Sequence, residues 1–204
     1  MNNRAVFTVV IILAFATGFM SAEMLSTRSP NSGENVIVSN NTKIMALNDR
    51  DYYTVAMEKI NSAKKSIHMV MYEIRWYGNP EGNPRDVCQL ANALVNAQKR
   101  GVKVKIILDD GRGYGFSNND LVDAAKNWSS YFKSHGIEVR FDWSNETTHD
   151  KLIIIDGEIV IVGSTNWSQS ALNYNHEANA LIESKEVANE YEKYFNNLWE
   201  KYQG

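Results

Sequence analysis

Two residues of complementary chemistry stand two positions apart in the second half of the chain. His149 and Lys151 are followed by Asp156 and then by Gly-Ser-Thr-Asn at residues 163–166, with aliphatic residues at most positions between. Residues two apart on a strand project from one face, so the imidazole and the ammonium group can meet one phosphate. A neutral imidazole can attack phosphorus, and a lysine supplies positive charge where negative charge develops. The spacing therefore predicts phosphodiester chemistry.

The other residues of this pattern suit the binding of an anion. Ser164 and Asn166 are also two apart and can donate hydrogen bonds to the non-bridging phosphate oxygens. We expect Gly163 to permit a close approach of two backbone segments. Asp156 falls in the turn of a predicted hairpin, so we expect it to cap backbone amides or to pair with a basic side chain. No group of His, Asp and Glu has metal-ligand spacing, so we expect neither a metal nor a cofactor.

The joint spacing resembles the signature of the phospholipase D superfamily, and the chain from about residue 66 to 202 is similar to its small single-motif endonucleases. The likeness includes Asp109-Asp110 after an aliphatic strand, Asp142 before the motif, and Glu177 eleven residues after Asn166. In the resembled family the histidine becomes phosphorylated, and a carboxylate orients its other ring nitrogen. The resemblance thus implies His149, Lys151, Asn166 and Glu177 as catalytic residues, with Glu177 matching that carboxylate by spacing.

A single motif supplies only half of the groups that the reaction needs. Cleavage through a phosphohistidine also requires an acid that protonates the leaving oxygen. The chain has four histidines, and His68, His135 and His176 do not stand in a second His-x-Lys setting. We therefore expect a homodimer that brings two copies of His149 to one pocket, as the resembled single-motif nucleases are built.

Three functions fit this pattern. The first is a metal-independent endonuclease that cleaves DNA, or RNA, through a phosphohistidine. The second is a phospholipase D that hydrolyses head groups of membrane phospholipids, and the third is a silent phosphate-binding module. The net charge of −3 and a sequence pI near 5.8 give no global attraction to nucleic acid, so phosphate binding must be local.

The first part of the chain predicts a position outside the cytoplasm. Residues 1–25 hold a basic start and an apolar run, which predict either a signal peptide or a retained membrane anchor. Residues 26–48 are rich in Ser, Asn, Thr and Gly and read as a flexible tether. We expect the catalytic domain at residues 49–204, secreted or membrane-anchored. The single cysteine, Cys88, excludes an intrachain disulfide and is expected to be plain packing.

The domain shows an alternation of helix and strand patterns that predicts an α/β fold, a mixed sheet with helices on both faces. Helices are expected at about 49–64, 84–101, 119–134 and 186–202, with Asp49 and Asn118 or Asn119 as caps. Strands are expected at 66–74, 102–108, 137–141 and 178–182, and at 151–155 and 158–162, which form a hairpin about Asp156-Gly157.

Overall fold

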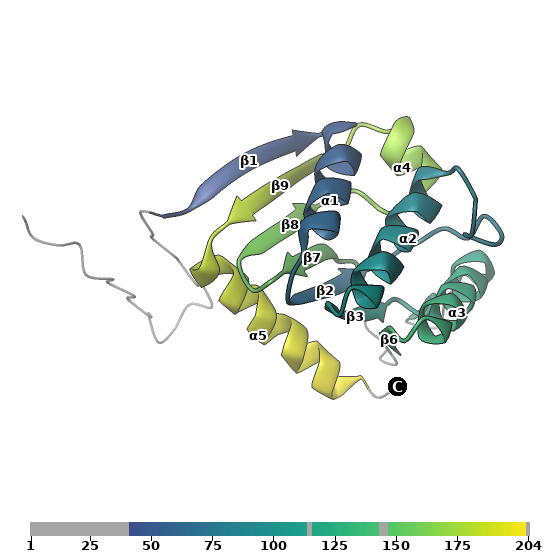
Figure 1. Ribbon diagram of the computed structural model, residues 1–204. Helices are drawn as coiled ribbons and strands as arrows, with labels where there is room; N and C mark the ends of the chain where they lie inside the picture. Colours follow the sequence, from purple (N-terminus) through teal and green to yellow (C-terminus); the bar gives the residue numbers. More distant parts are fainter. Residues whose placement is uncertain (1–40, 114–115, 143–146, 203–204) are drawn as a thin grey trace, which may run out of the picture. The chain divides into compact units, whose positions relative to one another are not determined.

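The computed structural model describes residues 41–113, 116–142 and 147–202, and these form the α/β fold that the sequence predicts (Figure 1). The central sheet has seven strands in the order β1-β9-β8-β7-β2-β3-β6. Its strands are β1 (Lys43–Asn48), β2 (Ser66–Met71), β3 (Lys103–Leu108), β6 (Glu138–Phe141), β7 (Lys151–Ile155), β8 (Ile159–Gly163) and β9 (Ala178–Glu183). The helices are α1 (Asp51–Ser62), α2 (Asp86–Lys99), α3 (Asn119–Ser134), α4 (Gln169–Asn173) and α5 (Lys185–Lys201). The predicted leader and the tether up to residue 40 lie outside the described residues.

The strand directions decide which residues share an edge of the sheet. Strands β2, β3 and β6 run parallel to one another, whereas β7, β8, β9 and β1 are joined by antiparallel pairs. Parallel neighbours need crossover connections, and α2 and α3 provide them. As a result, one edge of the sheet, which runs across the strand ends and not along an outer strand, holds the ends of β1, β2, β3, β6 and β8 and the starts of β7 and β9.

Helices cover both faces of the sheet, as expected. On one face Ile67 and Met69 of β2 belong to the larger core, which is shared with α1, α2 and α3. On the other face Val70 and neighbouring strand residues pack against Phe195 and Trp199 of α5. This alternation follows from the two-residue period of a strand, so one strand serves two cores.

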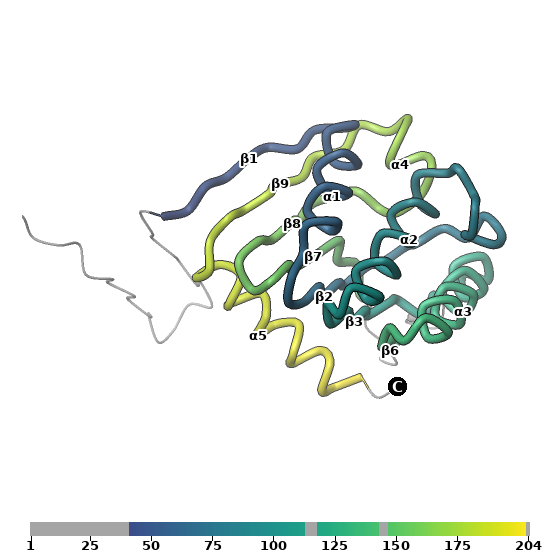
Figure 2. Tube along the Cα trace, in the orientation of Figure 1, coloured from purple at the N-terminus to yellow at the C-terminus, as the bar shows by residue number. Residues whose placement is uncertain are grey.

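The described domain begins earlier than residue 49. Residues 43–48, predicted as the end of the tether, form strand β1, which pairs antiparallel with β9 at the edge of the sheet (Figure 2). Leu47 is the buried residue of this strand, 1% exposed, while Ile44 and Met45 remain exposed. An edge strand of this kind gains its stability from backbone pairing, so it leaves little hydrophobic pattern in the sequence.

Asp49 does not cap α1, contrary to the prediction. Helix α1 begins at Asp51, after Arg50, and Asp49 has a left-handed backbone with φ of 51°. Its carboxylate accepts from the Glu177 amide at 2.8 Å, while its own amide donates to the Glu177 carbonyl at 2.9 Å. Elsewhere Asn118 caps α3 as expected, with its side chain accepting from Leu121. The short helix α4 and the two-residue strands β4 (Arg112–Gly113) and β5 (Phe116–Ser117) were not predicted.

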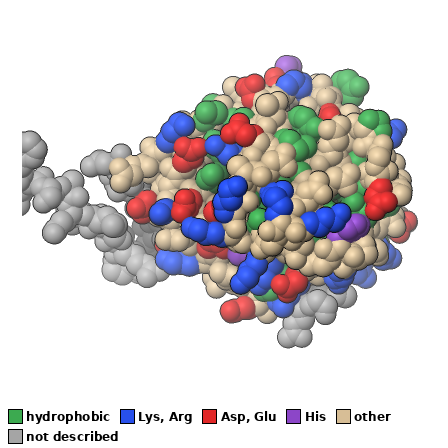
Figure 3. Space-filling view, in the orientation of Figure 1, with side chains coloured by type: hydrophobic (Ala, Val, Ile, Leu, Met, Phe, Trp, Pro, Cys, Tyr) green, Lys and Arg blue, Asp and Glu red, His purple; other side chains and the backbone are tan. Residues whose placement is uncertain are grey.

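Cys88 has the packing role that was expected for it. Cys88 is fully buried in α2, and His68 contacts Glu192 at 2.6 Å and stacks on Phe195. Figure 3 shows acidic and basic side chains interspersed over one face, with hydrophobic side chains between them in scattered patches. In the part of the chain that the structure describes, no helix combines the length and the apolar character that crossing a membrane requires.

Candidate active site

The strand topology brings the predicted site residues to the same edge of the sheet. Lys151 is the first residue of β7 and pairs with Met71, the last residue of β2. Gly163 ends β8 and pairs with Asn179 near the start of β9. Residues 149–151, 164–166 and 177 therefore meet at one place, although nearly thirty positions separate the first from the last.

His149 and Lys151 are held together by backbone and ring contacts. The Lys151 ammonium donates to the His149 carbonyl oxygen at 2.7 Å and lies 4.8 Å from the centre of the Tyr72 ring. The same ring lies 4.5 Å from the His149 imidazole, centre to centre. The lysine residue is only 6% exposed, whereas His149 is exposed. A buried cation thus stands next to an accessible imidazole.

The surroundings favour the neutral form of His149. Partial burial, and then the positive charge of Lys151, lower the pKa of His149, while Asp150 opposes them. Burial also lowers the pKa of Lys151, but Asp150 and Glu177 counteract this and favour the charged ammonium. A neutral imidazole beside a charged lysine is the pairing that nucleophilic attack on a phosphodiester requires.

Glu177 lies at this edge, and its hydrogen bonds go to residues other than His149. Its carboxylate accepts from the Ser164 hydroxyl and from the Asn175 amide, the latter at 3.0 Å. In the described residues no hydrogen bond joins Glu177 to the ring of His149. Ser164 was expected to donate to phosphate. Its hydroxyl group instead donates a hydrogen bond to the Glu177 carboxylate and accepts one from the Ala178 amide at 3.1 Å.

Asn166 and Gly163 lie at the same edge of the sheet as His149 and Lys151. The side-chain oxygen of Asn166 is buried and has no hydrogen-bond partner among the described residues, which leaves an unused acceptor beside the motif. At Gly163 an added Cβ would lie 2.5 Å from the Ala178 carbonyl oxygen and 2.3 Å from the Asn179 side-chain oxygen. The close backbone approach expected at this glycine is therefore present.

Asp156 stands at the opposite end of the hairpin and caps backbone amides, as predicted. It has a left-handed φ of 58°, and its carboxylate accepts from the amides of Lys64, Lys65 and Ser66 at 2.6 to 3.1 Å. These amides lie at the junction between α1 and β2. The third residue of the motif thus ties the hairpin to the neighbouring strand and takes no direct part in the site.

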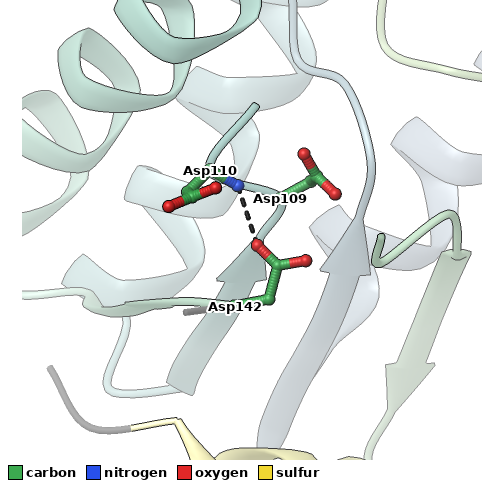
Figure 4. A group of neighbouring side chains, drawn as sticks. All are labelled: Asp109, Asp110 and Asp142. Atoms are coloured by element: carbon green, nitrogen blue, oxygen red, sulfur yellow. Dashed lines mark hydrogen bonds between the residues drawn. The ribbon is translucent and has the colours of Figure 1, made fainter. Parts of the chain in front are cut away.

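Sequence reasoning missed Tyr72 and the environment of three aspartates. Tyr72 follows β2 as one more residue of an apolar run, so nothing in the sequence distinguishes it. Asp109, Asp110 and Asp142, noted only as part of the likeness, gather in a buried cluster (Figure 4). Their position at the ends of adjacent parallel strands was the available signal.

Known proteins are similar to this chain in sequence and in fold. Residues 56–199 match the family described as "Cardiolipin synthase, PLD-like domain". The chain is 33% identical to the mitochondrial cardiolipin hydrolase of Xenopus laevis over 113 residues, which are 55% of this chain and 50% of the relative. It is 35% identical to the phospholipase D of Rickettsia prowazekii over 136 residues, 66% of this chain and 56% of the relative. The chain spans about half the length of these curated relatives.

Among solved structures, the phospholipase D family member Nuc from Salmonella typhimurium superposes with a TM-score of 0.62 at 28% identity, covering 79% of this chain and 97% of Nuc. NucT from Helicobacter pylori superposes with a TM-score of 0.59 at 23% identity, covering 80% of this chain and 99% of NucT, and shows the same fold. The family match extends over most of the chain and includes His149, Lys151, Asn166 and Glu177. The chain therefore belongs to the phospholipase D superfamily, as a member with the PLD-like domain.

Proposed function

We propose that this chain hydrolyses phosphodiesters of nucleic acid, with DNA as the first candidate, through a phosphohistidine on His149. The observation that carries the proposal is the pairing of an exposed imidazole of lowered pKa with a buried lysine. An exposed nucleophile can reach a phosphate in a polymer backbone, and a buried cation acts on that phosphate with little screening by water.

The proposed reaction has two steps. A ring nitrogen of neutral His149 attacks phosphorus, the bond to the leaving oxygen breaks, and an acid protonates that oxygen. Water then attacks phosphorus, the bond between phosphorus and the His149 nitrogen breaks, and the group that gave the proton takes one from the water. Lys151 stabilises the negative charge on the non-bridging oxygens in both steps, and the side-chain NH2 group of Asn166 donates to the same phosphate.

Aromatic side chains beside the site favour nucleic acid as the substrate. Tyr174 is 77% exposed and lies three residues before Glu177, and Tyr194 is 41% exposed and donates to Asp150 at 2.8 Å. Exposed tyrosines can stack on bases, which stabilises single-stranded nucleic acid by about 1–3 kcal/mol per base. The other exposed large hydrophobic residues of the described chain, Ile44 and Met45, lie on β1 and not beside His149. Among the residues that the structure describes, the site is thus not surrounded by an apolar surface for lipid tails.

A phospholipase D activity is the second candidate, and the names of the curated relatives favour it. The matched proteins of Xenopus laevis and Rickettsia prowazekii are called cardiolipin hydrolase and phospholipase D. A membrane anchor at residues 1–25 would bring the domain to head groups, and we propose this anchorage, with the domain outside the cytoplasm, for both activities. A phosphate-binding module without activity is the third reading, and an intact set of His149, Lys151 and Asn166 speaks against it.

We further propose that the acid comes from His149 of a second copy of the chain. The three other histidines do not supply a second His-x-Lys site. The ring of His68 contacts Glu192, and His135 follows the last residue of α3 and therefore does not lie at this edge of the sheet. His176 is adjacent to Glu177, and its ring lies 3.2 Å from the Asp49 carboxylate. It is the alternative acid within one chain, so His176→Ala separates the two possibilities.

The test compares substrates and variants side by side. The protein is incubated with single-stranded DNA, duplex DNA, RNA, and vesicles that contain phosphatidylcholine or cardiolipin, and the products are resolved. We expect cleavage of DNA, loss of turnover in His149→Ala, and an essentially unchanged rate in His176→Ala. Release of lipid head groups without nucleic-acid cleavage would replace the nuclease by a phospholipase D. No hydrolysis of any of these substrates by a folded protein would refute the proposed function.

A further inference from the structure

Three aspartates meet beneath the segment that leads into the active site. Asp109 and Asp110 follow β3, and Asp142 follows β6, with exposed fractions of 2%, 8% and 0%. Figure 4 shows the three side chains next to one another, joined by the hydrogen bond that the Asp110 amide donates to Asp142, at 2.8 Å. Three buried acids at the ends of two adjacent strands are costly unless each has partners.

Every carboxyl oxygen of the cluster accepts from the protein itself. Asp109 accepts from the Gly111 amide at 2.8 Å through one oxygen and from the Thr148 amide at 3.0 Å through the other. Asp142 accepts from the Asp110 amide through one oxygen and from the same Thr148 amide at 2.9 Å through the other. Asp110 binds the backbone and side chain of Arg112. This donor set suits a backbone clamp, because a cation would have to displace these donors.

The shared amide of Thr148 links the cluster to the nucleophile. Thr148 is 6% exposed and immediately precedes His149, so the two carboxyl groups fix the backbone from which the imidazole projects. The carboxyl groups of Asp109 and Asp142 lie close together: an oxygen of each lies within 4.8 Å of the other, and both groups accept from the same Thr148 amide. Two buried carboxyl groups at this distance do not both ionise readily, and sharing one proton relieves their repulsion.

We propose that Asp109 and Asp142 are positioning residues that hold one proton between them and clamp the Thr148 amide, and that loss of this proton loosens the segment carrying His149. The proposal rests on the proposed function in so far as it takes His149 as the nucleophile. The clamp makes turnover depend on a group that never contacts the substrate.

Burial disfavours ionisation of both carboxyl groups: it raises the pKa of Asp142 as well, where hydrogen bonds from Thr148 and Asp110 oppose the rise. Burial, and then the charge of Asp142, raise the pKa of Asp109 to about 7, whereas the amides of Gly111 and Thr148 oppose this. Three groups face the pair: the Tyr72 hydroxyl just after β2, the Lys151 ammonium from β7, and the Asp110–Arg112 ion pair in the segment that follows Asp109. From α3, the wall next to Asp109 consists of the apolar residues Leu121 and Ala125.

Two conservative variants separate the roles of the two acids. In Asp109→Asn, the amide group can still donate to Asp142 where the protonated acid did, and it carries no charge at any pH. The oxygen that it replaces no longer accepts from Thr148, but the Thr148 amide keeps the Asp142 oxygen as its acceptor. In Asp142→Asn, one of two oxygens that accept backbone amides becomes a donor, so two donors face each other. Asn at 109 should therefore preserve the clamp, and Asn at 142 should break it.

The first experiment measures kcat and KM for bis(4-nitrophenyl) phosphate across the pH range, with full-length protein. The wild type should lose kcat as the pH rises through the value of about 7 for Asp109, whereas Asp109→Asn should lack this alkaline loss and stay within about threefold of wild type at lower pH. Asp142→Asn should lose kcat by about tenfold or more at all pH values with little change in KM. Identical alkaline limbs in the wild type and Asp109→Asn would overturn the proposal.

The second experiment tests the clamp without any substrate. Amide hydrogen exchange at Thr148 should be slow in the wild type under mildly acidic conditions, and its protection should fall by about tenfold once the shared proton is lost. Asp109→Asn should keep its protection throughout the pH range, and Asp142→Asn should have little at any pH. Exchange that follows only the intrinsic pH dependence in all three proteins would refute the clamp. If the exchange behaves as expected but no diester is hydrolysed, the proposed function fails while the clamp stands.

Discussion

Gly163→Ala is the substitution whose effect the structure predicts most directly. Gly163 does not have a left-handed backbone, so alanine is excluded only by lack of space. The new Cβ would lie 2.5 Å from both the Ala178 carbonyl oxygen and the Asn179 Cα. Since ordinary contacts lie at about 3.5 Å, β8 and β9 would have to separate locally by about 1 Å.

The cost of this separation can be worked out from the contacts that it disturbs. Overpacking a well-filled site costs about 1–3 kcal/mol. Asn179 accepts from the Thr165 amide at 3.1 Å and donates to the Leu47 carbonyl and the Thr165 hydroxyl at 3.2 and 2.8 Å. These buried bonds each contribute about 1 kcal/mol and would weaken together. We expect a loss of about 3–5 kcal/mol in the free energy of unfolding.

Activity should fall as well, because Ser164 follows Gly163 and Glu177 precedes β9. A displacement of about 1 Å in these residues predicts a loss of about 10²-fold in kcat/KM. Urea unfolding followed by circular dichroism measures the first effect, and diester hydrolysis below the unfolding transition measures the second. Gly82→Ala is the matched control: Gly82 has a φ of 67° with nothing within 4 Å of an added Cβ, so it should cost about 1–2 kcal/mol and no activity. A smaller destabilisation in Gly163→Ala than in this control would refute the reasoning.

Four further outcomes are expected. Asp156→Ala should lower the free energy of unfolding by about 2 kcal/mol in urea titrations, because three backbone amides lose their acceptor, yet kcat should change little; a large loss of kcat without destabilisation would contradict its structural role. Hydrolysis should survive excess EDTA, since Lys151 supplies the positive charge; activity that chelation abolishes and a divalent metal restores would contradict this. Because the folded state raises the pKa of Asp109 from 3.8 to about 7, it keeps a proton that the unfolded chain releases. The contribution of Asp109 to the free energy of unfolding is therefore full below pH 3.8 and is lost as the pH rises to about 7. Over this range the melting temperature of the wild type should fall relative to that of Asp109→Asn. Parallel curves of melting temperature against pH would contradict the raised pKa. A mixed dimer of wild-type and His149→Ala chains should retain at most a few per cent of the wild-type rate, about the effect of losing a general acid, whereas half of the rate would show a complete site in each chain.

Short-range patterns in the sequence were enough to predict the candidate site and its local frame. The fixed spacing of His149, Lys151, Asp156 and Asn166 predicted a phosphate site on a hairpin, because strand geometry puts alternate residues on one face wherever the strand lies. The hairpin strands β7 and β8 and the caps at Asp156 and Asn118 could be predicted from short-range patterns, since turn residues and hydrophobic alternation act locally.

Tertiary structure alone decided the contacts between segments far apart in the chain. Strand β1 looked like a tether because an edge strand is stabilised by pairing with β9 and buries few side chains. Tyr72 and Thr148 carry no sequence signal, and their roles follow from the pairing of β2 with β7 and from the ends of β3 and β6 meeting below them. Glu177 has the spacing of an orienting carboxylate, but its hydrogen bonds go to Ser164 and Asn175, a choice that depends on how β8 and β9 lie side by side.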